Sequence, residues 1–199
     1  HRGPANTEFT ASFTVPEPEK VEPRQPPRKL TAEEYTDGSP VYVVTSEPKD
    51  RRRDTSILSR QVNQGRDFRQ VGEPTPWVYN ALAFDSSDNW LYAVSQIRGQ
   101  NGDPCYPAGN LLQINPATGE VYNLGPILKA GSTGTPFETS GDRDVLNAGV
   151  YTSEGFFVGN TSTSGSRHLY KVDVDKVTAQ RVLGNQVSYS EDWAVLPQA

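Results

Sequence analysis

Short apolar runs separated by polar turns fill the chain from Val41 onward. The segment 80–95, NALAFDSSDNWLYAVS, predicts a strand, a turn and a returning strand, because Asp, Ser and Asn side chains bond their own backbone in turns. The segment 147–161, NAGVYTSEGFFVGNT, repeats this hairpin more loosely, and segments 110–126 and 168–184 predict a second kind of hairpin. The pattern indicates antiparallel strands throughout this region.

A repeat of about 50 residues underlies these hairpins. The phrases FRQVG, VYNLG and QRVLG end at Gly72, Gly125 and Gly184, which are 53 and 59 residues apart. A period near 50 with about four short strands is typical of propeller blades. A blade has two apolar faces and is stable when neighbours cover both. We therefore predict an all-β, propeller-like repeat of four-stranded antiparallel blades.

The number of blades is too small for a closed propeller. The sequence contains two complete blades at 80–126 and 147–184, a partial one at 41–72, and a segment at 192–196 that resembles the first strand of another unit. A closed propeller typically needs at least four blades. We expect an incomplete or open arrangement: a truncated propeller, one completed by another chain, or an open arc or sandwich.

The first 40 residues differ from the rest and predict an extended, proline-rich N-terminal arm, so we divide the chain into an arm, 1–40, and a propeller-like β domain, 41–199. VPEPEKVEPRQPPRKL favours polyproline conformations that cannot build a core. Before it, EFTASFTV places Phe9, Phe13 and Val15 on one face of an extended strand. This strand would pair with its own domain or add an edge strand to a neighbour.

The charge and composition exclude some functions. The net charge is −5, and the basic cluster KDRRRD at 49–54 is interrupted by acids, so we predict no nucleic-acid partner. No apolar run approaches the length of about 18 residues that a membrane span requires. The one cysteine, Cys105, excludes a disulfide within the chain and suggests a loop thiol or a bond to another chain. The absence of methionine is compatible with a precursor cleaved before His1, which would point to export, or with a shortened chain.

The motifs YNALAFDSSDNWLYAVS, LLQINPATGEVYNLGP, NAGVYTSEGFFVGN, HLYKVDVDKVTAQRV and EDWAVLP, between about residues 77 and 197, resemble a known family. They are similar to the propeller-like (DUF6923-like) repeat domains of secreted or cell-surface microbial proteins. Asn115 stands where that family usually has aspartate. The resemblance implies a propeller-like fold and an extracellular, secreted or cell-surface location, and it implies no activity.

Few residues suggest catalysis. A hydrolytic triad needs a histidine, and the two histidines are His1 and His168, of which His168 opens a predicted strand. The acid-bearing segments at 85–89, 140–144 and 173–175 are typical of turns and lack the pattern of an EF-hand calcium loop. We assign no catalytic residue, metal ligand or cofactor, and the sequence favours a non-catalytic protein without deciding the question.

Loop aromatics are the candidate binding residues: Trp77, Tyr79 and Tyr106, since Tyr and Trp are enriched at binding surfaces, although each also fits blade packing. Asn160 in NTS would be a glycosylation site in a eukaryotic source. The predicted function is a non-catalytic extracellular binding or structural module. One form of it would be a subunit of a surface assembly whose arm contacts a neighbour. Its partner would be a protein, another copy, or a glycan. The alternative is a secreted enzyme with carboxylate or metal-assisted chemistry in a blade-loop pocket.

Overall fold

The computed structural model describes residues 41–48, 54–62, 67–96, 106–132, 146–160 and 168–186, and it is all-β with no helix in these ranges. The strands predicted within these ranges are confirmed, and one short strand, β8, was not predicted. The strands are β1 (Tyr42–Pro48), β2 (Asp54–Gln61), β3 (Phe68–Gln70), β4 (Tyr79–Asp85), β5 (Trp90–Ser95), β6 (Asn110–Ile114), β7 (Val121–Pro126), β8 (Leu128–Lys129), β9 (Leu146–Thr152), β10 (Gly155–Asn160), β11 (His168–Asp173) and β12 (Thr178–Gln186).

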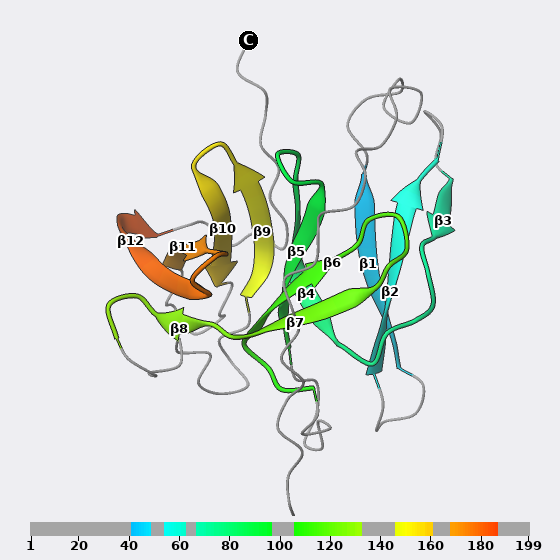
Figure 1. Cartoon of the computed structure of the whole chain (residues 1–199), viewed down its shortest axis with the longest axis horizontal. Helices are drawn as coiled ribbons and strands as arrows, with labels where there is room; N and C mark the ends of the chain where they lie inside the picture. The colour runs from blue at the N-terminus through cyan, green and yellow to red at the C-terminus, as the bar shows by residue number, and fades with distance from the viewer. Residues whose placement is uncertain are drawn as a thin grey trace, which may run out of the picture.

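The strands form three sheets that lie side by side (Figure 1). Sheet A has the order β1-β2-β3, sheet B has the order β4-β5-β6-β7, and sheet C has the order β8-β12-β11-β10-β9. Sheet B is the four-stranded antiparallel unit that the sequence predicts. Sheet A has three strands among the described residues, and sheet C gains a fifth because β8 pairs in parallel with β12. The expectation of uniform four-stranded blades is therefore met in part.

Polar side chains determine where the hairpins turn. Between β4 and β5, the Asp85 carboxylate accepts hydrogen bonds from the backbone N–H and the hydroxyl of Ser87, at 2.8 and 2.7 Å. Between β6 and β7, the side chain of Asn115 accepts bonds from the N–H groups of Ala117 and Thr118. Such side-chain contacts replace backbone partners that a tight turn leaves unpaired. The side chains of Asp85 and Asn115 thus hold these two turns by local hydrogen bonds.

Sheet B lies between the other two sheets and is covered on both faces. Trp90, Tyr92 and Val94 of β5 join a core with Phe156 and Val158 of sheet C. The alternate residues of the same strand, Leu91 and Ala93, join a second core with Leu58 of sheet A. Every residue of β5 is buried as a result. Each large side chain buried in this way contributes about 1.5–3 kcal/mol, which explains why a strand apolar on both faces needs two neighbours.

The inner strands β4 and β9 approach each other closely. Ala81 of β4 has a positive φ of 53°, and the register with β5 shifts between Asn80 and Ala83. This bulge turns Tyr79 toward sheet A, whereas Ala81 and Ala83 face sheet C. On β9, a Cβ atom added to Gly149 would overlap the carbonyl oxygen of Ala81. Glycine is required here because the two backbones are in contact.

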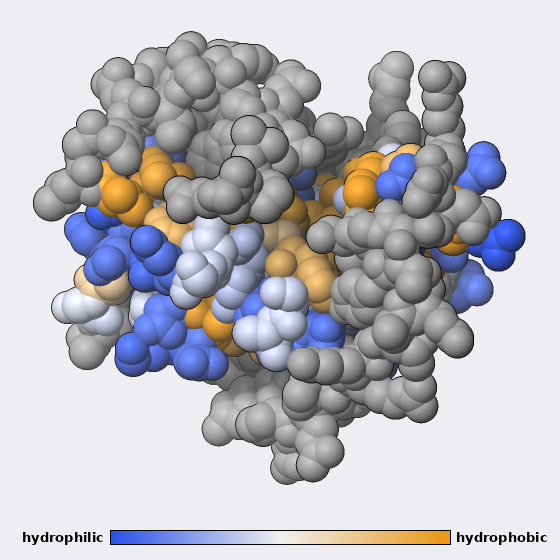
Figure 2. Space-filling view, turned by 90° about the horizontal axis from the view of Figure 1, so that it is seen from above, coloured by the Kyte–Doolittle hydropathy of each residue, from blue (hydrophilic) through white to orange (hydrophobic). Residues whose placement is uncertain are grey.

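The outer face of sheet A is apolar and open to solvent. Tyr42, Val44 and Leu58 face sheet B, whereas Val43 and Phe68 lie on the opposite face and are 38% and 45% exposed. Val41, on the same face, is 46% exposed. Seen from above, hydrophobic residues are visible at both lateral ends of the molecule, beside hydrophilic ones (Figure 2).

The described sheets stay open: none closes into a barrel, and the three together do not close into a propeller ring. This agrees with the incomplete or open architecture that the sequence predicts. The proposed arm, 1–40, and the predicted strand at 192–196 lie outside the described residues. Neither the boundary at residue 40 nor the arm itself is therefore tested by the fold.

Candidate functional site

The structure brings together the three aromatic residues predicted to bind a partner, and it places them in a core. Trp77 and Tyr79 are 8% and 3% exposed, and both belong to the cluster between sheets A and B. The ring of Tyr106 meets that of Trp77 edge-on, with centroids 5.1 Å apart. Burial raises the pKa of the Tyr79 hydroxyl well above its usual range, so it stays neutral. The packing alternative explains these contacts, and ligand binding at these residues stays a prediction.

Other candidate residues fall outside what the structure describes. Phe9, Phe13, Val15 and Cys105 belong to undescribed segments, as does residue 193 with its predicted blade strand. Asn160 ends β10, and its side chain is not described. His168 begins β11, where its ring meets Tyr170 edge-on with centroids 6.1 Å apart. Among the described residues, its buried Nδ1 atom has no hydrogen-bond partner.

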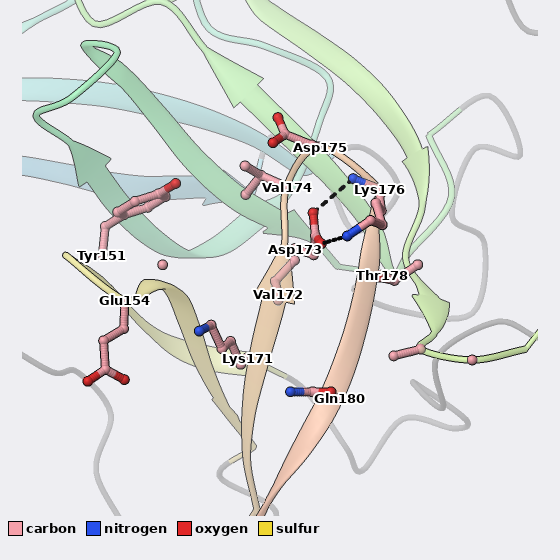
Figure 3. Close-up of a pocket in the computed structure, with 13 residues that line it drawn as sticks. Tyr151, Glu154, Lys171, Val172, Asp173, Val174, Asp175, Lys176, Thr178 and Gln180 are labelled. Carbon is pink, nitrogen blue, oxygen red and sulfur yellow. Dashed lines mark hydrogen bonds and ion pairs between the residues drawn. The ribbon is translucent and has the colours of Figure 1, made fainter.

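A cavity of about 620 Å³ lies at one end of sheet C and is open to solvent (Figure 3). Its walls come from the ends of β8 and β9, from the β9–β10 turn, and from β11, β12 and the turn between them. The sequence does not reveal this cavity, because its parts are far apart along the chain. The lining residues are Ala130, Gly131, Tyr151, Glu154, Gly155, Lys171, Val172, Asp173, Val174, Asp175, Lys176, Thr178 and Gln180.

One carboxylate of the cavity is already occupied. Asp173 accepts the Lys176 ammonium at 2.6 Å on Oδ2 and the Lys176 backbone N–H at 3.0 Å on Oδ1 (Figure 3). The Lys176 side chain lowers the pKa of Asp173, and the carboxylate in turn raises the pKa of Lys176. The arrangement is that of a closed turn, which matches the turn interpretation of the acids at 173–175. Each oxygen of the Asp173 carboxylate therefore already accepts one hydrogen bond from Lys176.

Tyr151 links the cavity to sheet B. Burial raises the pKa of its hydroxyl, and the hydrogen bond to Asp85 of the β4–β5 turn raises it further. Its ring stacks on that of Tyr92, with centroids 5.6 Å apart, and on that of Phe156 at 6.0 Å. Tyr151 is therefore a neutral donor held in place by its partners, and it connects the cavity wall to the core between sheets B and C.

Beside this tyrosine, the half-buried Asp88 and the buried Tyr92 form a second hydrogen-bonded pair. The Tyr92 hydroxyl donates to Asp88 Oδ2 at 2.7 Å, and the Trp90 backbone N–H donates to Oδ1 at 2.9 Å. Burial raises the pKa of Asp88 despite these two donors, and it raises the pKa of Tyr92 as well. The pair closes the β4–β5 turn onto its own strand, and neither residue lines the cavity.

Two further charged residues, Lys171 and Glu154, line the cavity. Lys171 lies over the ring of Phe157, with its Nζ atom 5.8 Å from the centroid, and Glu154 sits on an exposed turn. Among the residues that the structure describes, no group of three His, Cys, Asp or Glu side chains is placed to hold a metal ion.

The fold and the site define a class of protein: an all-β protein in which similar antiparallel sheets recur and stack. The chain belongs to the family described as a repeat of unknown function (DUF6923), whose model matches residues 45–197. A search of curated proteins gives no match. The described residues contain no helix with the length and apolar character needed to cross a membrane.

Proposed function

We propose that the chain is a non-catalytic binding or structural module of the extracellular space, built as a propeller-like stack and used as a subunit of a surface assembly. The observation that carries the proposal is the difference between two sheets. Sheet B is covered on both faces, whereas sheet A leaves Val41, Val43 and Phe68 exposed on its outer face. Adjacent apolar residues at an exposed sheet face favour contact with another protein surface.

The arm is the part of the chain proposed to contact the neighbour, through Phe9, Phe13 and Val15. Light scattering on the full chain, from low to high micromolar concentration, tests the assembly itself, and a rise in mass with concentration is expected. Removing residues 1–30 should abolish that rise. Changing Phe9, Phe13 and Val15 to serine should reproduce the deletion, whereas serine at Thr10 and Thr14, on the opposite face of the same predicted strand, is the matched control. A constant monomer mass of the full chain would contradict the proposal.

The extracellular location is supported by the resemblance of the repeat motifs to those of secreted and cell-surface domains. Its test is the exposure of the protein on intact cells of its natural source. The chain should be found in the medium, or be digested by added protease while a cytoplasmic marker survives. Detection in the cytoplasmic fraction alone would contradict the proposal.

A second candidate function is an enzyme that uses carboxylate or metal-assisted chemistry in the cavity. The observation that favours it is that Glu154 and Asp175 line the same open cavity as the Asp173–Lys176 ion pair. Calcium should then raise the melting temperature, and Asp175→Asn should remove the effect. The absence of any calcium dependence would leave the binding module as the stronger proposal.

A further inference from the structure

Sheets B and C each carry a row of three paired residues beside their hairpin turns, which we call the stacking row. The three residues pair across neighbouring strands, and their side chains pack in the core with the sheet that precedes them in the chain. The rows are Leu91, Ile114 and Val121 in sheet B, and Phe156, Val172 and Ala179 in sheet C. The same positions therefore serve both contacts between sheets.

The stacking row of sheet A is exposed instead. The phrases FRQVG and VYNLG both end at a glycine with positive φ, and their alignment places Phe68 at the position of Val121. Phe68 pairs with Gln61, whose backbone N–H donates to the carbonyl oxygen of Val41. Val41 and Phe68 are 46% and 45% exposed. Sheet A thus presents apolar side chains to solvent at positions that the other two sheets bury against a neighbour.

On the opposite face of each sheet, the residues next to the stacking row differ in size between sheets B and C. In sheet B, Trp90 precedes the row and Tyr122 follows it, and their rings meet edge-on in the core with sheet C, with centroids 5.6 Å apart. In sheet C, Gly155 and Gln180 take these two places, and both line the cavity of about 620 Å³. The cavity therefore includes the space that two aromatic rings fill in sheet B.

Resting on the proposed assembly, we infer that this cavity is a socket for the ring of Phe68 from a second copy. In the contact between sheets B and C, the small Ala179 of the stacking row shares a core with the two rings of sheet B. In the contact between copies the sizes are exchanged, because the row of sheet A brings the ring and the glycine and glutamine of the socket leave room for it. Matching of large against small side chains is what close packing of two surfaces requires.

Lys171 adds a favourable contact inside the socket. It lines the cavity from β11, and its Nζ atom already lies 5.8 Å from the ring centroid of Phe157 (Figure 3). An ammonium group close to an aromatic face attracts it, so Lys171 suits an incoming phenylalanine. The contact joins the outer face of sheet A to the outer face of sheet C, and association between unlike surfaces of this kind is head-to-tail.

A complementation experiment tests this contact. Phe68→Ser removes the ring and keeps the socket, whereas Gln180→Trp fills the socket and keeps the ring. Each variant alone should self-associate at least about tenfold more weakly than the full chain in light scattering, because buried aromatic residues dominate many interfaces. A mixture should form a one-to-one dimer, since the second variant supplies Phe68 to the open socket of the first. Undiminished association of either variant, or a mixture that associates no better than its components, would overturn the inference.

Matched variants control for changes in folding. Arg69→Ser alters the opposite face of β3, and Gln180→Asn leaves the socket open, so both should associate like the full chain. Phe68→Trp keeps an aromatic ring and should also associate. Melting curves check that every variant folds. Loss of association in Arg69→Ser and Gln180→Asn equal to that in Phe68→Ser and Gln180→Trp would contradict a contact through the socket.

Cross-linking gives a second measurement that keeps both Phe68 and the socket. In a Cys105→Ser background, Gln70→Cys lies two residues from Phe68 on the same strand, and Thr178→Cys lines the cavity. A short bismaleimide should link these two variants into a mixed dimer, and Glu120→Cys on sheet B, used in place of Gln70→Cys, should not form one. Equal yields for the two mixtures would contradict the inference.

The two proposals fail in different ways. If Phe68→Ser associates as strongly as the full chain while removal of residues 1–30 abolishes association, this inference fails and the proposed assembly through the arm survives. If the full chain is monomeric at every concentration, both fail.

Discussion

Sheets A and B are made of similar short antiparallel strands, yet their surroundings differ. The central strand β5 of sheet B is buried along its whole length, between Leu58 on one side and Phe156 on the other. Sheet A has one such neighbour among the described elements, and its strand β3 is exposed at all three residues. The comparison shows that the burial of a strand in this fold depends on the sheets that cover its two faces.

The largest expected effect comes from two phenylalanines in these contrasting positions. Phe156→Ala removes a ring that is 0% exposed in the core between sheets B and C, and it should lower the free energy of unfolding by about 3–5 kcal/mol. Phe68→Ala removes a ring that is 45% exposed and should change it by less than about 1 kcal/mol. Denaturant unfolding of both variants measures the difference. Equal losses would show that sheet A is as closely covered as sheet B.

The contact between β4 and β9 should be nearly as sensitive. In Gly149→Ala the new methyl group would overlap the backbone of Ala81, and since backbone cannot rotate away, a loss of about 3 kcal/mol is expected. Gly131→Ala is the matched control, because Gly131 has a positive φ of 78° but open space around it. In Gly131→Ala the free energy of unfolding should fall by about 1 kcal/mol, because of backbone strain alone. A smaller loss of melting temperature for Gly149→Ala than for Gly131→Ala would contradict this expectation.

A smaller effect is expected at the polar edge of the core between sheets B and C. Tyr92→Phe removes the hydroxyl that donates to Asp88. It should lower the free energy of unfolding by roughly 1.5–3 kcal/mol at neutral pH, because the acceptor is ionised there. Tyr106→Phe, at the core between sheets A and B, is the control and should cost less, since no hydrogen bond of the Tyr106 hydroxyl is found within the described residues.

The same variant should show a distinctive pH dependence. The pKa of Asp88 is raised in the folded state, so ionising this carboxyl disfavours folding, and the penalty is relieved as pH falls through the folded pKa toward the ordinary value of 3.8. The Tyr92 hydroxyl stabilises the ionised form of Asp88 by donating a hydrogen bond to it, and Tyr92→Phe removes this stabilisation. The destabilisation of Tyr92→Phe should therefore shrink on acidification, as followed by thermal melts from neutral pH to about pH 4. If the destabilisation by Tyr92→Phe does not change with pH, its cause is lost packing and not the hydrogen bond to Asp88.

The smallest effect is expected for the exposed ion pair of the cavity. Lys176→Ala removes the partner of Asp173, and the melting temperature should hardly change, because water and salt screen this pair. Any contribution should be present at neutral pH and lost as pH falls through the lowered pKa of Asp173, below 3.8. Lys129→Ala, another exposed lysine, is the control. A large loss in melting temperature at neutral pH would mean that the turn at 174–177 supports the stack.

Prediction of the candidate site from the sequence was much weaker than prediction of the strands. Trp77 and Tyr106 suggested a binding surface by composition, and the structure shows them packed together between sheets. The cavity residues Tyr151, Lys171 and Gln180 come from three different strands, and no local pattern connects them. Their meeting depends on how the sheets stack, which a periodicity of two residues does not encode.

The sequence by itself determined the strands and the turns of this protein, because alternation and turn side chains act over a few residues. It also determined that β5 needs a neighbour on each face, since both sets of alternate residues are apolar. Tertiary structure alone decided which side chains share a core, where the bulge at Ala81 redirects β4, and why Gly149 must be glycine. These features arise from contacts between segments distant in sequence, and such contacts exist only once the sheets have stacked.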